Sequence, residues 1–197
     1  MKIIALNVGK VTEYKDLIAS PAKVFKSAID KSPVSSLDNS RPLRVSYLGL
    51  YGDEQADSSV HGGYDKALYA YPLEHYSFWE GLTEKEMRIN VSFSFGHFGE
   101  NLTVSGLTEH EVWVGDIWFI GDTELRVTKL REPCFKFNVK MNFSKAAKTM
   151  IQTAKSGWYL RVIKEGIIQA GDPIKVVHGP KKMSIKSQND LLLAKGK

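Results

Sequence analysis

Three Gly-Asp pairs in the second half of the chain, each next to a short apolar run, constrain most strongly what this chain can fold into. The pairs are Gly115-Asp116, Gly121-Asp122 and Gly171-Asp172. Glycine supplies the backbone angles of tight turns, and an aspartate side chain accepts hydrogen bonds within its own turn. Short strands separated by such turns are typical of a closed or partly closed β-barrel. The apolar runs that we expect to be strands are Val112–Val114, Ile117–Ile120, Leu125–Val127 and Ile174–Val177.

The rest of the chain adds further strands and scattered helices. Residues 32–42 hold two prolines among Ser, Asp and Asn, which predicts a loop. A helix is expected over residues 144–153, with Ser144 as its N-cap. Further strands are expected at Ile3–Val8, Ala22–Ser27, Val45–Leu48, Tyr69–Tyr71 and Trp158–Ile163. The fold class is therefore mostly β, with some helix.

The length of 197 residues, 43% of them apolar, is enough for one sizeable hydrophobic core. No internal segment has linker composition, so we expect one domain over residues 1–180 and a basic tail over 181–197 that forms a short helix. No apolar run approaches the ~18 residues of a membrane span, and the apolar start is too short for a signal sequence. A single cysteine fits a reducing compartment, and we expect a cytoplasmic protein without membrane contact.

The net charge of +5 is unevenly distributed along the chain. Residues 1–125 carry a net charge of −7, whereas residues 126–164 carry +9. Such a basic block suits a nucleic-acid binder, although no zinc-finger or RNP-like motif accompanies it. Alternatively, acidic neighbours in the fold cancel the charge. A third interpretation is a basic wall around the only thiol, Cys134, that binds an anionic ligand and lowers the pKa of the thiol.

Cys134 follows Pro133 and is bracketed by Arg131 and Lys136. Nearby cations favour the thiolate, which is the form that attacks electrophiles or binds metals. A buried structural cysteine is the alternative, because an unpaired cysteine is often buried. The residues alone leave these two interpretations about equally supported.

His61 stands before Gly62 and Gly63 in a polar segment. The glycines allow a backbone to approach a ligand closely, or they simply form a turn. A pocket histidine and an ordinary solvated one are equally supported here. The chain has no HExxH, P-loop or GxGxxG motif, so zincin, P-loop and Rossmann functions lack support.

Several segments, taken in order, resemble the MOSC domain, which is named for the C-terminal part of molybdenum-cofactor sulfurase. The segments are GDEQAD at 52–57, HGGYDKA at 61–67, YPLEHYSFW at 71–79, FGENLT at 98–103, VGD at 114–116, REPC at 131–134 and GWYLRV at 157–162. The resemblance is strongest to the stand-alone bacterial branch, which is linked to detoxifying N-hydroxylated bases such as 6-hydroxylaminopurine. It extends from about Ile3 to Val177.

The resemblance implies a barrel-like core with peripheral helices, a molybdenum–pterin cofactor and reduction of N-hydroxylamines to amines. Cys134 corresponds to the proposed metal or sulfur ligand, and soft sulfur suits molybdenum. His61 matches the HGG histidine and would protonate the departing hydroxyl. The residues expected to bind the cofactor are Lys26, Lys31, Gln55, Gly62, Gly63, Lys66, Asn101 and Arg131.

The electrons for such a reduction come from outside the chain, because no flavin, nicotinamide or iron–sulfur motif is present. We therefore expect a separate flavoprotein or ferredoxin-type reductase as a partner. A non-catalytic molybdopterin or sulfur carrier that uses the same cysteine is the alternative function. Nucleic-acid binding ranks last.

Overall fold

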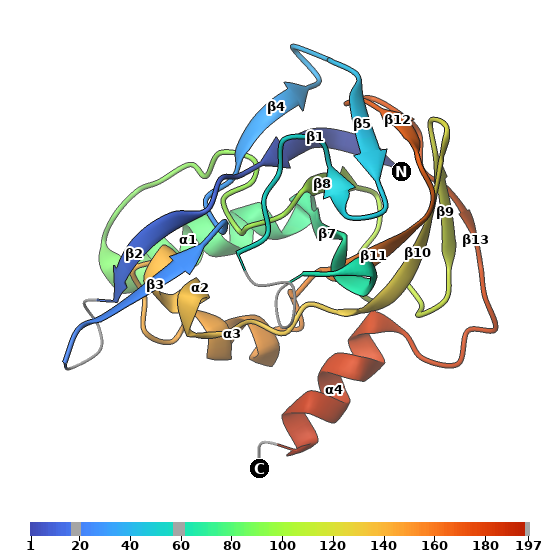
Figure 1. The fold of residues 1–197 in the computed structure, drawn as a ribbon. Helices are drawn as coiled ribbons and strands as arrows, with labels where there is room; N and C mark the ends of the chain where they lie inside the picture. Colours follow the sequence, from blue (N-terminus) through green and yellow to red (C-terminus); the bar gives the residue numbers. More distant parts are fainter. Residues whose placement is uncertain (17–20, 57–61, 196–197) are drawn as a thin grey trace.

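The computed structural model describes residues 1–16, 21–56 and 62–195 of the chain. Within them, one large sheet of eight strands dominates the fold (Figure 1). In spatial order it comprises β13 (Lys175–Val177), β9 (Ile117–Ile120), β10 (Thr123–Leu130), β11 (Trp158–Lys164), β7 (Leu68–Pro72), β8 (Leu102–Ser105), β1 (Lys2–Val8) and β4 (Ser32–Ser36). All neighbours are antiparallel except β7 and β8, which are parallel.

Smaller elements surround this sheet. One small sheet contains β12 (Gly166–Ile168), β5 (Leu43–Ser46) and β6 (Gly49–Leu50), and a separate hairpin contains β2 (Thr12–Asp16) and β3 (Lys23–Ser27). The helices are α1 (Tyr76–Met87), α2 (Phe135–Lys140), α3 (Ala146–Gln152) and α4 (Ile185–Lys195), with short 3-10 turns at Tyr64–Lys66 and Leu73–His75. None of the described helices is both long and apolar enough to cross a membrane.

Hydrogen bonds between the start of the chain and the third Gly-Asp turn curl the large sheet. Ile3 N donates to Asp172 O at 3.0 Å, and Gly171 N donates to Ile3 O at 2.9 Å. These bonds hold the segment before β13, which is one edge strand of the sheet, against β1, which lies next to the other edge strand. The sheet therefore forms a half-barrel, which confirms the prediction of a mostly β, partly closed barrel.

Two hydrophobic clusters hold the fold together. The larger one fills the half-barrel and includes Trp118 and Trp158, which are fully buried and meet edge to face at 5.7 Å. The second is aromatic and joins β7 to α1, α2 and α3, with Tyr71, Trp79 and Phe137 fully buried in it. The second cluster fixes the helices against the sheet at the edge of the pocket described below.

The loop expected at residues 32–42 is wrong in its first half. Residues 32–36 form β4, which pairs with β1 and has Pro33 opposite Asn7. A proline lacks the N–H that a central strand would donate, but β4 is at the edge of the sheet and has one partner. The proline therefore fits an edge strand and does not require a loop.

Two other local predictions fail because side chains capture the backbone. The strand expected at residues 112–114 is reduced to an isolated antiparallel bridge between Trp113 and Ser184. The chain turns at Val114-Gly115, where Asp116 Oδ2 accepts from Trp113 N at 3.1 Å. Ser144 does not cap the predicted helix, because α3 begins at Ala146. There the Asn138 side-chain oxygen accepts from Ala147 N at 2.7 Å.

The basic tail contains the expected helix, α4, and this helix is anchored to the body of the protein. Ile185 is fully buried within the main core. Gln188 accepts from Leu130 N at 2.7 Å, and Asn189 donates to Ile151 O at 2.7 Å. The helix thus packs against the end of β10, immediately before the segment that carries Cys134.

Candidate functional site

A pocket with a cavity volume of about 110 Å³ brings together segments from across the chain. Its walls come from the end of β3, the segment after β6, β7, the FGENLT segment, the REPC segment and β11. Six of the predicted site residues line it, namely Lys31, Gln55, Lys66, Asn101, Arg131 and Cys134. Residues that the prediction did not include, such as Asp53, Tyr69, Lys136 and Tyr159, line it as well.

Cys134 is half-buried at the edge of this pocket and directly precedes α2. Its backbone is extended, and its carbonyl accepts from Phe137 N at 2.9 Å to start the helix. Both cations that bracket it in sequence, Arg131 and Lys136, also line the pocket. The thiol therefore lies outside the hydrophobic clusters, in a pocket with lysine, arginine and acidic side chains. The charged residues of its lining are Lys31, Lys66, Arg131 and Lys136 together with Asp53, Glu54 and Glu132. The basic-wall interpretation stays a prediction.

Arg131 is a buried cation that packs against rings and sulfur. The residue is 6% exposed, and its guanidinium carbon lies 5.5 Å from the Tyr69 ring centroid and 4.9 Å from that of Phe137. Its Nη1 contacts Met150 Sδ at 3.1 Å. Within the described residues it makes no ion pair with a carboxylate. Because an uncompensated buried charge is costly, this position favours an anionic ligand.

Lys31 is different, because its charge is already compensated. Its ammonium pairs with the buried carboxylate of Asp53, which also accepts from Asn101 Nδ2 at 2.8 Å and from Gly9 N at 2.8 Å. Burial lowers the pKa of Lys31, and Asp53 opposes this shift. Asp53 is a site residue that the sequence analysis missed. Its position in the polar GDEQAD segment, shared with Gln55, is the signal that could have found it.

Gln55 connects the pocket to the HGG segment. Its Nε2 donates to Leu48 O at 2.9 Å, and its Oε1 accepts from Gly63 N at 2.9 Å. A Cβ atom at Gly62 would lie 2.1 Å from Gln55 Oε1, and Gly63 has a positive φ of 82°. The two glycines are therefore needed for close packing on Gln55. Neither is among the lining residues, and His61 lies outside the described residues.

Two predicted lysines occupy different places. Lys66 lines the pocket, with its ammonium 5.8 Å from the Tyr159 ring centroid. Lys26 is exposed on β3 and is not among the lining residues. Its carbonyl instead accepts from Lys136 Nζ at 3.1 Å, so Lys136 is the basic side chain that the hairpin helps to place at the pocket.

Glu100 organises the FGENLT segment from inside. It is fully buried and accepts from Gly96 N at 2.9 Å, from Phe98 N at 3.1 Å and from Thr103 Oγ1 at 2.9 Å, as well as from the Tyr76 hydroxyl. Burial raises the pKa of this carboxyl, and the hydrogen bonds oppose the shift. The next residue, Asn101, then projects toward Asp53 at the pocket.

His97, in the same loop, gives the protein a predicted pH dependence. Its ring stacks on Phe93 at 4.2 Å, and burial, aided by the charge of Lys140, lowers its pKa to about 4. Between about pH 6.5 and 4 the unfolded chain binds a proton that the native state does not, so stability falls as the pH falls. We expect His97→Gln to remove about 1–2 kcal/mol of the stability difference between pH 7 and pH 5. Urea unfolding of the wild type and of His97→Gln at pH 7 and pH 5 measures this difference. If the variant keeps the full pH dependence of the wild type, His97 is not its source.

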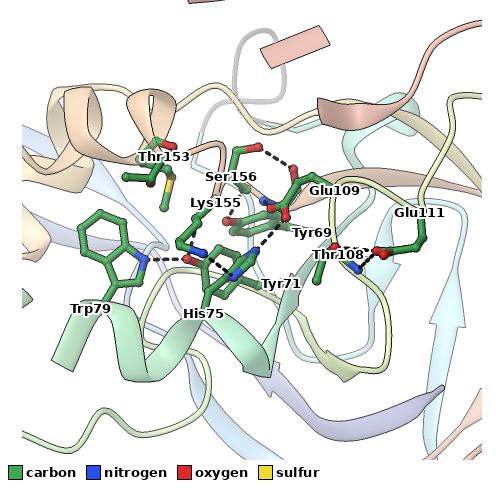
Figure 2. Close-up of polar contacts among 12 residues, drawn as sticks. Tyr69, Tyr71, His75, Trp79, Thr108, Glu109, Glu111, Thr153, Lys155 and Ser156 are labelled. Carbon is green, nitrogen blue, oxygen red and sulfur yellow. Dashed lines mark hydrogen bonds and ion pairs between the residues drawn. The ribbon is translucent and has the colours of Figure 1, made fainter. Parts of the chain in front are cut away.

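A buried polar network holds the turn that precedes β11 (Figure 2). His75 Nε2 lies 2.7 Å from Glu109 Oε2, and Glu109 Oε1 accepts from Gly157 N at 2.7 Å. The carbonyl of Gly157 in turn accepts from Arg131 N at 3.2 Å. The network thus fixes the turn before β11 and, through it, the backbone of Arg131. Through this network the YPLEHYSFW segment, one of those that carry the family resemblance, supports the site although it does not line the pocket.

The half-barrel, with a cysteine in a pocket of charged side chains after the end of β10, defines a MOSC-type protein. The chain belongs to the MOSC domain family, whose family model matches residues 57–175. The match covers the FGENLT, REPC and GWYLRV segments, and it confirms the family that the sequence analysis indicated.

Relatives and solved structures agree with this assignment. The chain is 37% identical to protein YiiM of Escherichia coli over 86% of this chain and 69% of that protein. A protein called a reductase from Gibberella moniliformis is 37% identical over 71% of this chain but only 24% of its own length. The crystal structure of YiiM from Geobacillus stearothermophilus has a TM-score of 0.74 at 34% identity, over 98% of this chain and 84% of that chain.

Proposed function

We propose that this protein is a molybdenum-cofactor-dependent reductase that converts N-hydroxylated compounds, of the 6-hydroxylaminopurine type, to amines. The observation that carries the proposal is that Cys134 and Arg131 line the same pocket. A half-buried thiol offers the soft donor that molybdenum accepts. The buried guanidinium pairs with no carboxylate in the part of the chain that the structure describes, which suits the anionic part of a pterin cofactor. The family membership supports the same cofactor.

Several of the pocket residues have a part in this proposal. Cys134 would hold the metal, while Arg131, Lys66 and Lys136 would neutralise the cofactor's anionic groups. The Asp53–Lys31 pair would hold Asn101 in place at the wall. The bound cofactor supplies two electrons for the reduction. His61 remains the predicted proton donor, from its place in the sequence.

The reaction is balanced when R–NHOH takes up two electrons and two protons and yields R–NH₂ and water. The N–O bond breaks, and the oxygen leaves as water after a proton from His61 reaches it. The electrons come from a separate flavoprotein or ferredoxin-type donor. The reductase name of the relative from Gibberella moniliformis supports this class of reaction.

A carrier role is the second candidate, because Cys134 in the same pocket would equally hold molybdopterin or a persulfide. The two functions differ in what the protein does with reductant and substrate. A reductase turns over an N-hydroxylated base, whereas a carrier binds its cargo without forming amine.

Turnover by molybdenum-loaded protein with reduced methyl viologen and 6-hydroxylaminopurine is the test, with the amine measured by chromatography. We expect steady amine formation that falls at least about a hundredfold in His61→Ala, with molybdenum retained, because a positioned acid contributes about that much. His110→Ala, at an exposed histidine, is the matched control and should keep full activity. Loaded protein that forms no amine would support the carrier instead.

A further inference from the structure

The proposed electron donor has to come close to Cys134, which directly precedes α2, and α3 packs next to α2. Cys134 directly precedes α2, and Phe135, the next residue, is 48% exposed. In Figure 1, α2 and α3 lie next to each other beside the β2–β3 hairpin. We define the α2–α3 surface by Phe135, Lys136, Lys145 and Lys148.

The charge of this surface has one sign. Residues 133–164 contain seven Lys and Arg and no Asp or Glu. Lys145 and Lys148 are exposed at the start of α3, whereas Lys140 pairs with Asp30. Glu132, the acid just before this stretch, lies 3.4 Å from Lys129. The charged side chains that define the α2–α3 surface are therefore all positive.

An exposed aromatic side chain lies within this positive surface. The Phe135 ring meets the edge of Phe25 at 5.2 Å, and Phe25 stacks on Tyr14 at 5.4 Å. Lys136 lies 5.5 Å from the centroid of Phe25. The stack supports Phe135 from behind while half of its surface stays open to solvent. An aromatic anchor with a charged rim is the usual anatomy of a protein–protein interface.

We propose that the α2–α3 surface docks a small acidic electron-transfer protein, with Phe135 as its apolar centre. This inference rests on the proposed reductase function, which needs a donor close to Cys134. Charge complementarity would speed the encounter and orient the donor. Nucleic acid is the less favoured occupant, because the charges are lysines, which lack the planar fork with which arginine binds phosphate in two places.

The double variant Lys145→Glu and Lys148→Glu tests the proposal. Acids in the first turn of a helix are favoured by its dipole, so α3 should keep its stability. Lys181→Glu and Lys182→Glu is the matched control, since it makes the same change in net charge at exposed lysines before α4, away from α2 and α3 in Figure 1. An acidic [2Fe–2S] ferredoxin is the probe, and its affinity for each molybdenum-loaded protein is measured by calorimetry at low ionic strength.

We expect the affinity for ferredoxin to fall about tenfold in the α3 variant and less than about twofold in the control. The ferredoxin-driven rate should fall in parallel, while the methyl-viologen-driven rate stays unchanged. Equal affinities of the two variants, or no binding by the wild type, would overturn the docking site. The alternative result is that the wild type binds a single-stranded oligonucleotide more tightly than it binds ferredoxin. Loss of that binding in the α3 variant would assign the surface to nucleic acid. Absence of methyl-viologen-driven turnover counts against the reductase, separately from the binding result.

Discussion

Replacement of Cys134 by Ser is expected to remove both molybdenum and reductase activity while leaving the fold intact. Serine has nearly the same shape, but its hard oxygen is a poor substitute for a thiolate toward molybdenum. The contact that starts α2 uses the backbone carbonyl of residue 134, so the substitution does not disturb it. Stability should therefore change by less than about 1 kcal/mol.

Three measurements on one preparation separate these effects, namely the molybdenum content, the rate with reduced methyl viologen and the midpoint of thermal unfolding. His110→Ala, made and loaded in parallel, shows whether an ordinary surface substitution disturbs loading. A Cys134→Ser protein that keeps its molybdenum and its rate would remove the cysteine from the site.

Replacement of Glu100 by Ala is expected to cause the largest loss of stability, about 3–5 kcal/mol. The carboxylate accepts hydrogen bonds from two backbone N–H groups, a threonine hydroxyl and the Tyr76 hydroxyl, all in a buried setting. Alanine leaves these donors unpaired, and each unpaired buried donor costs about 1–3 kcal/mol before relaxation. Urea unfolding measures the loss.

Glu100→Gln is the matched control. It keeps one oxygen acceptor at nearly the same place but turns an N–H₂ group toward one of the donors. We therefore expect a stability between those of the wild type and of Glu100→Ala. If alanine costs no more than about 1 kcal/mol, the FGENLT segment is not organised by this carboxylate.

The strands next to the Gly-Asp turns were largely predictable, because their turn chemistry is local. The strands expected at Ile117–Ile120 and Leu125–Val127 both form, and they pair across the Gly121-Asp122 turn, with Thr123 opposite Ile120. The turn at Asp116 and edge strand β4 were not predictable in this way. They depend on a side-chain hydrogen bond and on a position at the sheet edge, which residue patterns do not reveal.

The sequence predicted many of the residues that form the candidate site, but not which of them contact one another. Arg131 and Cys134 are close in sequence, so their common pocket followed from the local pattern. The pairing of Lys31 with Asp53 joins residues from different parts of the fold, and only the folded chain brings them together. The packing of Arg131 between Tyr69 and Phe137 likewise depends on β7 and α2. The role of His61 stays a prediction.

The central claim is that the pocket of Cys134 and Arg131 holds a molybdenum cofactor. Elemental analysis of the wild-type protein, freshly purified from cells that make the cofactor, tests this most directly, with Cys134→Ser purified in parallel. The account predicts molybdenum approaching one atom per chain in the wild type and a background level in the variant. A wild-type protein with no more molybdenum than the variant would contradict it.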